Sequence, residues 1–277
     1  MSPDEYCQQK AAHSGSSFYY SFLFLPSERR RAITALYAFC REVDDAVDEP
    51  SDAGVARATL AWWRAEVARL HAGKPQHPVT RALQPAVETF GLSEERLNEI
   101  MDGMEMDLNQ SRYMDFPGLE LYCRRVAGAV GMLAAGIFGY RNPETLRYAE
   151  KLGLAFQLTN IVRDVGEDAR KNRIYLPMDE LKRFGVTAAD ILNARQTENF
   201  ARLMQFQAER ARRCYDEALA LLPAEDRRAQ RPGLMMAAIY RALLDEIAGE
   251  NYQVLRQRTA LTPIRKLWIA WRTWVTA

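Results

Sequence analysis

The sequence predicts an all-α protein in which many antiparallel helices surround a central cavity. Apolar residues recur at helical spacing from Ser27 almost to the end of the 277-residue chain. The sequence shows neither the alternating pattern of a long strand nor an internal repeat. The length fits one large domain or two small ones, and 48% hydrophobic residues can form a large core. A bundle of this kind places functional side chains on facing helices.

Turn and cap residues divide the chain into successive helices. Ser27 offers a cap for the first long helix, and Phe116-Pro117-Gly118 predicts a turn in the middle of the chain. One helix carries Trp62, Trp63, Val67 and Leu70 on its apolar side and stops near Gly73. The other expected helices cover about residues 2–12, 27–50, 79–90, 93–111, 120–140 and 142–168, short pieces within 178–193, and residues 196–222 and 232–257.

The stretch from Gln157 to Asp168 has the most informative pattern. In a helix, Gln157, Asn160, Asp164 and Asp168 project from one stripe at i, i+3, i+7 and i+11. Apolar neighbours such as Ile161 indicate a packed interior, where paired carboxylates need a positive partner. Because the stripe itself has no lysine or histidine, a hard cation such as Mg²⁺ is the expected partner of these oxygen ligands.

A second stripe of the same kind lies in the helix that follows Ser27. Tyr37, Arg41, Asp44 and Asp48 fall at i, i+4, i+7 and i+11. If the two stripes face each other, they form a cavity that holds several Mg²⁺ ions, and Mg²⁺ usually shares its ligands with substrate phosphates. The implied ligand is a diphosphate. The alternative is that each acidic pair is a solvated helix face, but such faces usually carry a lysine four residues away, and neither stripe does.

Two further segments could contact phosphate. The stretch from Ser14 to Tyr20 offers hydroxyls and backbone N–H groups, although taken alone it is better explained as a loop with a serine N-cap. Arg170, Lys171 and Arg173 directly follow the stripe that ends at Asp168. They either close over diphosphate oxygens or stabilise a helix C-terminus, and their location beside the aspartates favours the first function.

The helix expected over residues 120–140 contains four glycines. Each lowers helix propensity by about 1 kcal/mol in an exposed helix, so the glycines indicate either close helix contact or room for a ligand in an apolar tunnel. These two interpretations are equally good from the segment alone. The preceding helix carries Asp102, Glu105 and Asp107, which are expected to form mostly a solvated face.

Composition excludes several other functions. A net charge of +1 implies no general attraction to nucleic acid. The four cysteines are widely spaced and predict buried thiols in a reducing cytosol, and the three histidines are too scattered for a zinc site. The N-terminus lacks the features of a signal peptide, and the longest uncharged run, residues 126–140, is too short for a membrane span. We expect a cytoplasmic protein.

The last 27 residues have a different character. They contain five basic residues and no acidic one. Ile264, Leu267, Trp268, Trp271, Trp274 and Val275 form one face, and Arg265, Lys266 and Arg272 lie largely off it. Basic helices with tryptophan often lie on membrane surfaces, so this helix either contacts the inner face of the membrane or packs on the core of the protein.

On these motifs, the chain resembles the squalene/phytoene synthase family of head-to-head prenyl transferases. The resemblance covers nearly the whole chain in order, and the matching motifs are Tyr37–Asp48, Ala127–Gly131, Gln157–Asp168 and Arg173–Pro177. Within the family, the opening stretch Ser14–Pro26 looks most like the branch that makes presqualene diphosphate in the bacterial hopanoid pathway.

The resemblance implies a single domain with the isoprenoid synthase fold over residues 1–277, and it assigns roles to individual residues. Mg²⁺, in two or three ions that Mn²⁺ could replace, is expected on Asp44, Asp48, Asn160, Asp164 and Asp168. The expected catalytic residues are the four aspartates with Tyr37 and Tyr122. The expected substrate contacts are Ser14, Ser16, Ser17, Phe18, Arg41, Gln157, Arg163, Arg173, Tyr240 and Arg258.

The implied reaction joins two molecules of farnesyl diphosphate to presqualene diphosphate and releases diphosphate. Alternatives are phytoene synthesis from the twenty-carbon donor, or squalene or hydroxysqualene synthesis. No NADPH is expected, and downstream squalene-forming enzymes are expected partners. An alternative outside the family is a helical protein that binds metal or lipid without catalysis.

Overall fold

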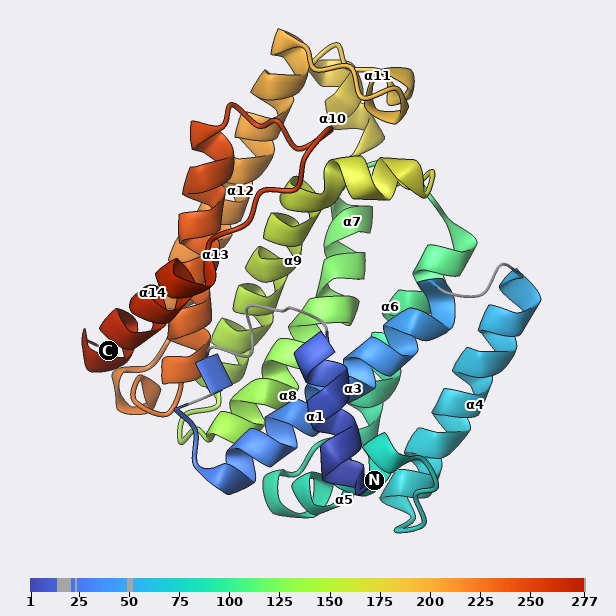
Figure 1. Cartoon of the computed structure of the whole chain (residues 1–277), viewed down its shortest axis with the longest axis vertical. Coiled ribbons are helices and arrows are strands. Elements are labelled where there is room, and N and C mark those ends of the chain that lie inside the picture. Colours follow the sequence, from blue (N-terminus) through green and yellow to red (C-terminus); the bar gives the residue numbers. More distant parts are fainter. Residues whose placement is uncertain (14–20, 23, 49–51, 277) are drawn as a thin grey trace.

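The structure, a computed structural model, describes residues 1–13, 21–22, 24–48 and 52–276. Within these residues the secondary structure is helical, apart from one isolated bridge between Arg112 and Ile174, so the all-α prediction is confirmed (Figure 1). The helices are α1 (Pro3–His13), α3 (Ser27–Asp48), α4 (Ala53–His71), α5 (Pro78–Phe90), α6 (Glu94–Asn109), α7 (Phe116–Cys123), η1 (Arg124–Gly128), α8 (Ala129–Phe138), α9 (Glu144–Arg170), α10 (Met178–Arg183), α11 (Ala188–Leu192), α12 (Glu198–Leu221), η2 (Ala224–Asp226), α13 (Arg231–Gly249) and α14 (Pro263–Thr276).

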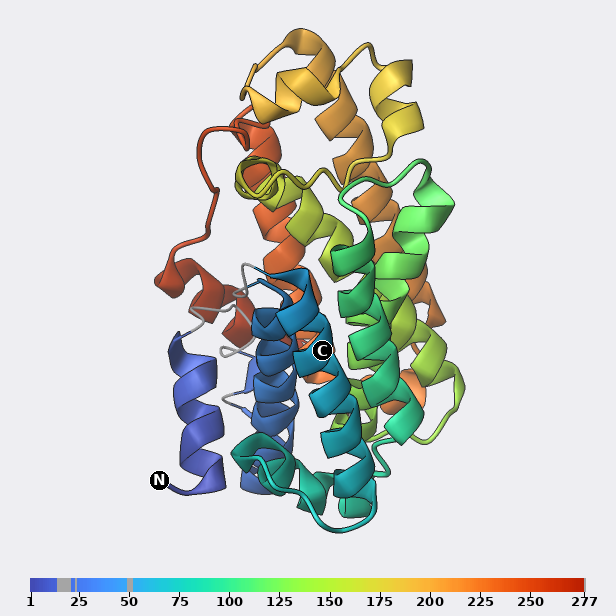
Figure 2. The same cartoon turned by 90° about the vertical axis from the view of Figure 1, so that its right-hand side faces the viewer.

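Helix α9 occupies the middle of the molecule. It packs against α12 on one side and against η1 and α8 on the other, as both views show (Figures 1 and 2). Helices α3, α4, α5 and α6 pack together on the far side of α8, and α14 packs on α13 at the edge of the molecule. Residues of α3, η1, α8, α9 and α13 line a common cavity. The predicted central cavity is therefore confirmed.

The helix predicted over residues 120–140 starts earlier in the structure and contains an irregular turn. It begins at Phe116, because Asp115 accepts a hydrogen bond from the backbone N–H of Gly118 and Pro117 lies in the first turn, where its missing N–H costs nothing. The predicted turn at Phe116-Pro117-Gly118 is thus a helix start. The stretch is continuous through Phe138, but Arg124–Gly128 forms a π-helical turn within it.

The helix expected over 232–257 is shorter than predicted. Helix α13 ends at Gly249, and Asn251 and Tyr252 have positive φ angles of 51° and 56°. The chain then runs without regular structure to α14 and contributes Thr259, Ala260 and Leu261 to the cavity wall.

In helix α4, one residue predicted to lie on the apolar side is exposed. Trp63, Val67 and Leu70 are buried as expected, but Trp62 is 42% exposed and the guanidinium of Arg69 lies over its ring. The two tryptophans are adjacent in sequence, so they point about 100° apart around the helix.

Close contact between η1–α8 and α9 explains two glycines. A Cβ atom on Gly131 would lie 2.3 Å from the carbonyl oxygen of Ala149, and one on Gly153 would lie 2.3 Å from that of Ala127. Both glycines also line the cavity. The two interpretations of the glycine-rich helix therefore both hold, since the small residues allow close packing and leave room for the cavity.

The stretch Phe116–Phe138 has the length and mean hydropathy of a membrane span. Half of its most apolar window is buried inside the helical body. Core helices of globular proteins meet the same criterion.

Candidate functional site

The cavity is a deep apolar space of about 460 Å³ between α3, η1–α8, α9 and α13. Residues near the start of α3, α9 and α13 and at the end of α8 line one end of it, which we call the floor: Ile33, Phe138, Tyr148 and Gly233. Above the floor the wall is mainly aliphatic, with Leu36, Val126, Val130, Ala134, Leu152, Met236, Ile239 and Leu243. This space suits a long hydrocarbon chain.

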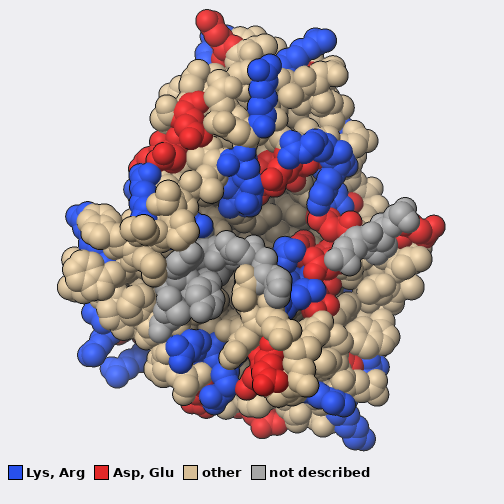
Figure 3. Space-filling model, in the orientation of Figure 1, with Lys and Arg blue, Asp and Glu red and all other residues tan. Residues whose placement is uncertain are grey.

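The opposite end of the same cavity is polar. Tyr37, Arg41 and Asp44 line it from α3, and Gln157, Asn160, Arg163 and Asp164 line it from α9. Tyr122, Tyr240 and Arg258 complete the predicted residues that reach the cavity. The prediction that the two stripes face a shared space is confirmed. The space-filling view shows a hollow on this face with acidic and basic side chains around it (Figure 3).

Asp48, Asp168 and Arg173 lie outside the cavity lining. Asp48 is the last residue of α3, and Arg173 follows the end of α9. Ser14, Ser16, Ser17 and Phe18, predicted to contact substrate, lie outside the described residues.

The stripes alone suggested that the carboxylates lack positively charged partners. In the structure, several of these carboxylates are paired with cations. Asp44 accepts a 2.7 Å hydrogen bond from Arg41, and Asp48 accepts bonds of 2.6 Å from both Lys171 and Arg173. Arg41 belongs to the same stripe as Asp44, whereas Lys171 and Arg173 follow the end of α9, so a search for lysine within each stripe could not find the partners of Asp48. Absence of positive charge is therefore not an argument for a metal here.

Asp164 is paired in the same way. It accepts hydrogen bonds from the guanidinium groups of Arg163 and Arg258, the latter at 2.9 Å. Arg258 lies on the segment between α13 and α14, which brings it back over the end of α9. Arg258, an expected substrate contact, thus lies at the polar end of the cavity.

The four aspartates differ in their protonation behaviour. Burial raises the pKa of Asp44 to about 6, with Asp48 adding to the rise, although Arg41 opposes it. Burial, followed by the charges of Asp164 and Asp107, raises the pKa of Asp168 to about 7. Burial would raise the pKa of Asp48 and Asp164 as well, but their hydrogen bonds from cations bring both below the usual value. A further cation near Asp44 and Asp168 would favour their charged forms.

The donor set fits magnesium that shares its ligands with a diphosphate. Asn160 Oδ1 is a buried oxygen without a hydrogen-bond partner, on a cavity-lining residue one helical turn before Asp164. Among the described residues, no three His, Cys, Asp or Glu side chains gather closely enough to hold an ion unaided. Mg²⁺ commonly takes only one or two carboxylates from the protein and completes its shell with water and phosphate.

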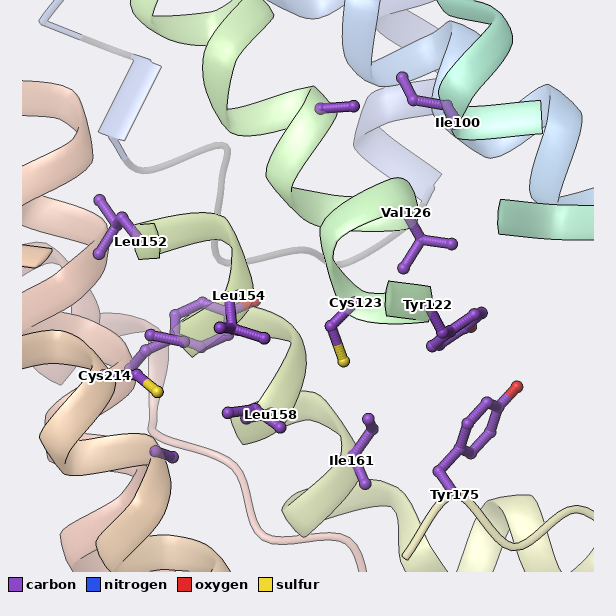
Figure 4. Packing of buried hydrophobic residues seen from close by; sticks show 14 of the residues in the cluster. Ile100, Tyr122, Cys123, Val126, Leu152, Leu154, Leu158, Ile161, Tyr175 and Cys214 are labelled. Atoms are coloured by element: carbon purple, nitrogen blue, oxygen red, sulfur yellow. The ribbon is translucent and has the colours of Figure 1, made fainter. Parts of the chain in front are cut away.

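A cluster around Asp107 was missed by the sequence analysis, which expected a solvated face. Asp107 accepts 2.9 Å hydrogen bonds from the hydroxyls of both Tyr122 and Tyr175. The rings of Tyr122 and Tyr175 stack with centroids 5.2 Å apart (Figure 4). Tyr113 stacks on the ring of Tyr175 at a centroid distance of 5.8 Å. Burial raises the pKa of Asp107 to about 6. Since Tyr122 lines the cavity, this cluster belongs to the site.

Lys266 is a second missed residue. It is half-buried on the inner face of α14 and lines the cavity near Arg163 and Arg258. Burial and the charges of these two arginines lower its pKa. Cations gathered at one end of an apolar cavity match an elongated ligand with an anionic head. The sequence pattern of the C-terminal helix indicated an apolar face and separate basic residues, and gave no signal that Lys266 reaches the cavity.

Comparison with known proteins gives the family. A model of the squalene/phytoene synthase family matches residues 11–265. Among curated proteins, the chain is 36% identical to 15-cis-phytoene synthase of Synechocystis sp., with 99% of this chain and 85% of the relative aligned. It is 38% identical to phytoene synthase of Arthrospira platensis, with 95% and 89% aligned.

Solved structures agree with this match. A dehydrosqualene synthase in complex with ligand superposes with a TM-score of 0.88 at 29% identity, over 99% of this chain and 96% of the other. Squalene synthase HpnC from Alicyclobacillus acidocaldarius superposes with a TM-score of 0.80 at 31% identity, over 90% and 94%. The helical architecture is thus the isoprenoid synthase fold of these neighbours. With facing aspartate stripes at the polar end of an apolar cavity, and a family match over most of its length, the chain belongs to the squalene/phytoene synthase family of prenyl-transferring enzymes.

Proposed function

We propose that the protein joins two prenyl diphosphates head to head. The observation that carries the proposal is the shape and polarity of one cavity: Asp44 and Asp164 face it from opposite helices at one end, and the other end is apolar. The diphosphates bind at the polar end, and the hydrocarbon chains extend toward Phe138 and Tyr148.

Mg²⁺, held by Asp44, Asp48, Asn160, Asp164 and Asp168, would draw charge from a diphosphate and make it a better leaving group. Mn²⁺ is a substitute with the same preference for oxygen. Arg41, Arg163, Arg258 and Lys266 supply positive charge to the remaining phosphate oxygens, and Arg173 does so from the end of α9.

The apolar wall protects the allylic cation that remains when diphosphate leaves, because it excludes water. The faces of Tyr37, Tyr122 and Tyr240 offer negative π density to this cation. The double bond of the second substrate attacks it, and loss of a proton closes a cyclopropane that still carries the second diphosphate. This compound is the product if the reaction ends at presqualene diphosphate. For phytoene, the second diphosphate also leaves, and the resulting cation rearranges and loses a second proton.

The proton acceptor is better assigned to the released diphosphate than to Tyr122. Burial, with the nearby charge of Asp107, raises the pKa of Tyr122 well above its usual value. A hydroxyl that already donates to Asp107 keeps its proton and orients the reacting groups.

For the substrate, the curated relatives favour geranylgeranyl diphosphate and the product phytoene, because both aligned relatives above are named phytoene synthases. This product therefore replaces presqualene diphosphate from farnesyl diphosphate as our leading proposal. Presqualene diphosphate stays the second candidate, since the structural neighbours are named dehydrosqualene synthase and squalene synthase. In that case a squalene-forming enzyme would consume the product. Neither reaction requires NADPH.

The test is a competition between equal amounts of geranylgeranyl and farnesyl diphosphate with Mg²⁺, without and then with NADPH, with products identified by mass spectrometry. Phytoene as the main product supports the leading proposal. Presqualene diphosphate accumulating in both reactions supports the second candidate, and squalene appearing only with NADPH would show a further reductive step. If no diphosphate is released from either substrate, head-to-head transfer is wrong and a non-catalytic lipid- or metal-binding role remains.

A further inference from the structure

The outer face of α14 carries an unusual concentration of exposed apolar side chains. Among the large apolar residues exposed in the described part of the chain, five lie on this helix: Ile264 (80%), Leu267 (41%), Trp268 (54%), Trp271 (56%) and Val275 (63%). They follow the spacing i, i+3, i+4, i+7 and i+11, so they form one stripe along the helix. We call this set the α14 stripe.

The side of α14 next to Leu267 is fixed to the body of the protein. Ala270 is fully buried, and Trp274 stacks on Phe24 with centroids 5.3 Å apart and lies under the guanidinium of Arg231. Of the predicted apolar face, Trp274 therefore packs on the core, and the other five residues are exposed. The packing of α14 on the core and the exposure of its stripe are compatible, because they use different faces.

Charge distinguishes the kind of partner that fits the α14 stripe. The helix contains three cations and no acidic residue. Arg265 and Arg272 are exposed and fall about 20° apart on one flank of the stripe by helical geometry. Arg272 lies over the ring of Trp268 at 5.4 Å. Figure 3 shows this edge of the molecule, at the left of the view, bordered by basic side chains.

A second protein chain fits the stripe less well than a lipid surface does. A fully buried tryptophan hides roughly 150–250 Å², so two half-exposed tryptophans and three aliphatic side chains offer less than the roughly 800 Å² that each partner of a standard protein interface contributes. Tryptophan and arginine side by side match the boundary between acyl chains and anionic headgroups, where indole rings and guanidinium groups both find partners.

We infer that the α14 stripe docks the protein on an anionic lipid surface. The stripe inserts among the acyl chains nearest the headgroups, and Arg272 contacts the lipid phosphates, while Arg265 is ion-paired with Glu246 of α13. The inner face of the same helix carries Lys266, and the segment before it carries Leu261, both of which line the cavity. Docking thus places the cavity wall beside the bilayer, where apolar chains enter and leave without crossing water.

The test is flotation of the full-length chain with phosphatidylcholine vesicles, with and without a minor share of phosphatidylglycerol, in the absence of substrate. We expect binding to the phosphatidylglycerol vesicles that falls by about tenfold or more in Trp268→Glu/Trp271→Glu and falls at higher salt. Arg272→Gln should weaken binding to the anionic vesicles only. The double variant Met114→Glu/Leu121→Glu is the matched control, because it adds the same charges at exposed apolar residues on another part of the surface.

Three results would overturn the inference: no flotation of the wild type with anionic vesicles, equal binding by the tryptophan variant, or a dimer of the wild type that this variant dissociates in sedimentation. The assay contains no substrate, so its outcome is separate from that of the proposed reaction. Turnover of detergent-dispersed substrate should be unchanged in the tryptophan variant, which also confirms that the variant is folded.

Discussion

Lys171 Nζ lies 2.6 Å from Asp48 Oδ2, which ties the loop after α9 to the last residue of α3. Arg173 contacts the other oxygen of the same carboxylate, also at 2.6 Å. Asp48 is thus a proposed metal ligand and a fixed partner of two cations. Metal binding at Asp48 would release Lys171 and Arg173 toward the phosphate oxygens, so metal and diphosphate binding should be coupled.

The first prediction concerns this pair. Asp48→Asn should lower turnover by about a hundredfold or more, because charge stabilisation of the leaving group is lost. Lys171→Gln should lower turnover by about tenfold, because it removes only one of several cations at the site. Calorimetric titration with inorganic diphosphate, with and without Mg²⁺, gives a readout besides turnover. Both variants should keep the helical circular dichroism signal. Wild-type turnover and Mg²⁺-dependent binding in Asp48→Asn would contradict its assignment.

The second prediction concerns Asp107 and Tyr122. Asp107→Asn should lower kcat by about tenfold to a hundredfold with a smaller effect on KM, because the hydroxyl of Tyr122 loses the carboxylate that orients it. Tyr122→Phe should have a similar effect, and the double variant should be little worse than either, since both remove one interaction. Glu105→Gln is the control and should be nearly neutral, because Glu105 lies about 200° around α6 from Asp107 and its ion pair with Arg64 is half-exposed. Additive effects of the two substitutions would mean that Asp107 and Tyr122 act separately.

The third prediction concerns chain length. Phe138 closes the floor of the cavity, so Phe138→Ala should raise the ratio of kcat/KM for geranylgeranyl over farnesyl diphosphate. Ala134→Phe, one turn higher on α8, should lower the same ratio by shortening the space. We expect a change of about tenfold or more in each direction, since even one methylene group gained or lost in an apolar pocket changes kcat/KM by about that much. If both variants change the ratio in the same direction, the floor does not determine which chain length the cavity accepts.

The fourth prediction concerns helix contact. Gly153→Val should destabilise the fold by about 3 kcal/mol or more, because its Cβ would meet backbone atoms that cannot move aside. Gly249→Ala, at the end of α13, has no atom within 4 Å of the added Cβ and should be neutral or slightly stabilising. Thermal unfolding followed by circular dichroism measures both. A melting temperature of Gly153→Val equal to the wild type would mean that α9 and η1 can separate without cost.

The sequence predicts the two aspartate stripes because their positions depend only on helical spacing within one element. It also predicts the facing arrangement, since two similar stripes with apolar neighbours need a shared interior. The pairing of Asp48 with Lys171 could not be predicted in this way, because 123 residues separate them and the contact depends on how α3 and α9 end in space.

Asp107 shows the same limit. Its helix carries other acids that are partly exposed, so the local pattern indicates a solvated face. Its hydroxyl partners are 15 and 68 residues away. The buried environment is made by Tyr122 and Tyr175 together, and neither tyrosine is informative alone.

The π-helical turn Arg124–Gly128 has a consequence for the whole cavity wall. A helix rotates by about 100° per residue, and a π turn accommodates one extra residue. Tyr122 and Phe138 are sixteen residues apart, so in an unbroken α-helix they would point about 160° from each other. The extra residue reduces this difference to about 60° and lets one helical stretch present Tyr122 to the reacting end and Phe138 to the floor. A single-residue deletion within Arg124–Gly128 that restored an unbroken α-helix would therefore keep Tyr122 and Phe138 about 60° apart, whereas conversion of the π turn to α-helix at unchanged length would put the two ends of the wall out of phase.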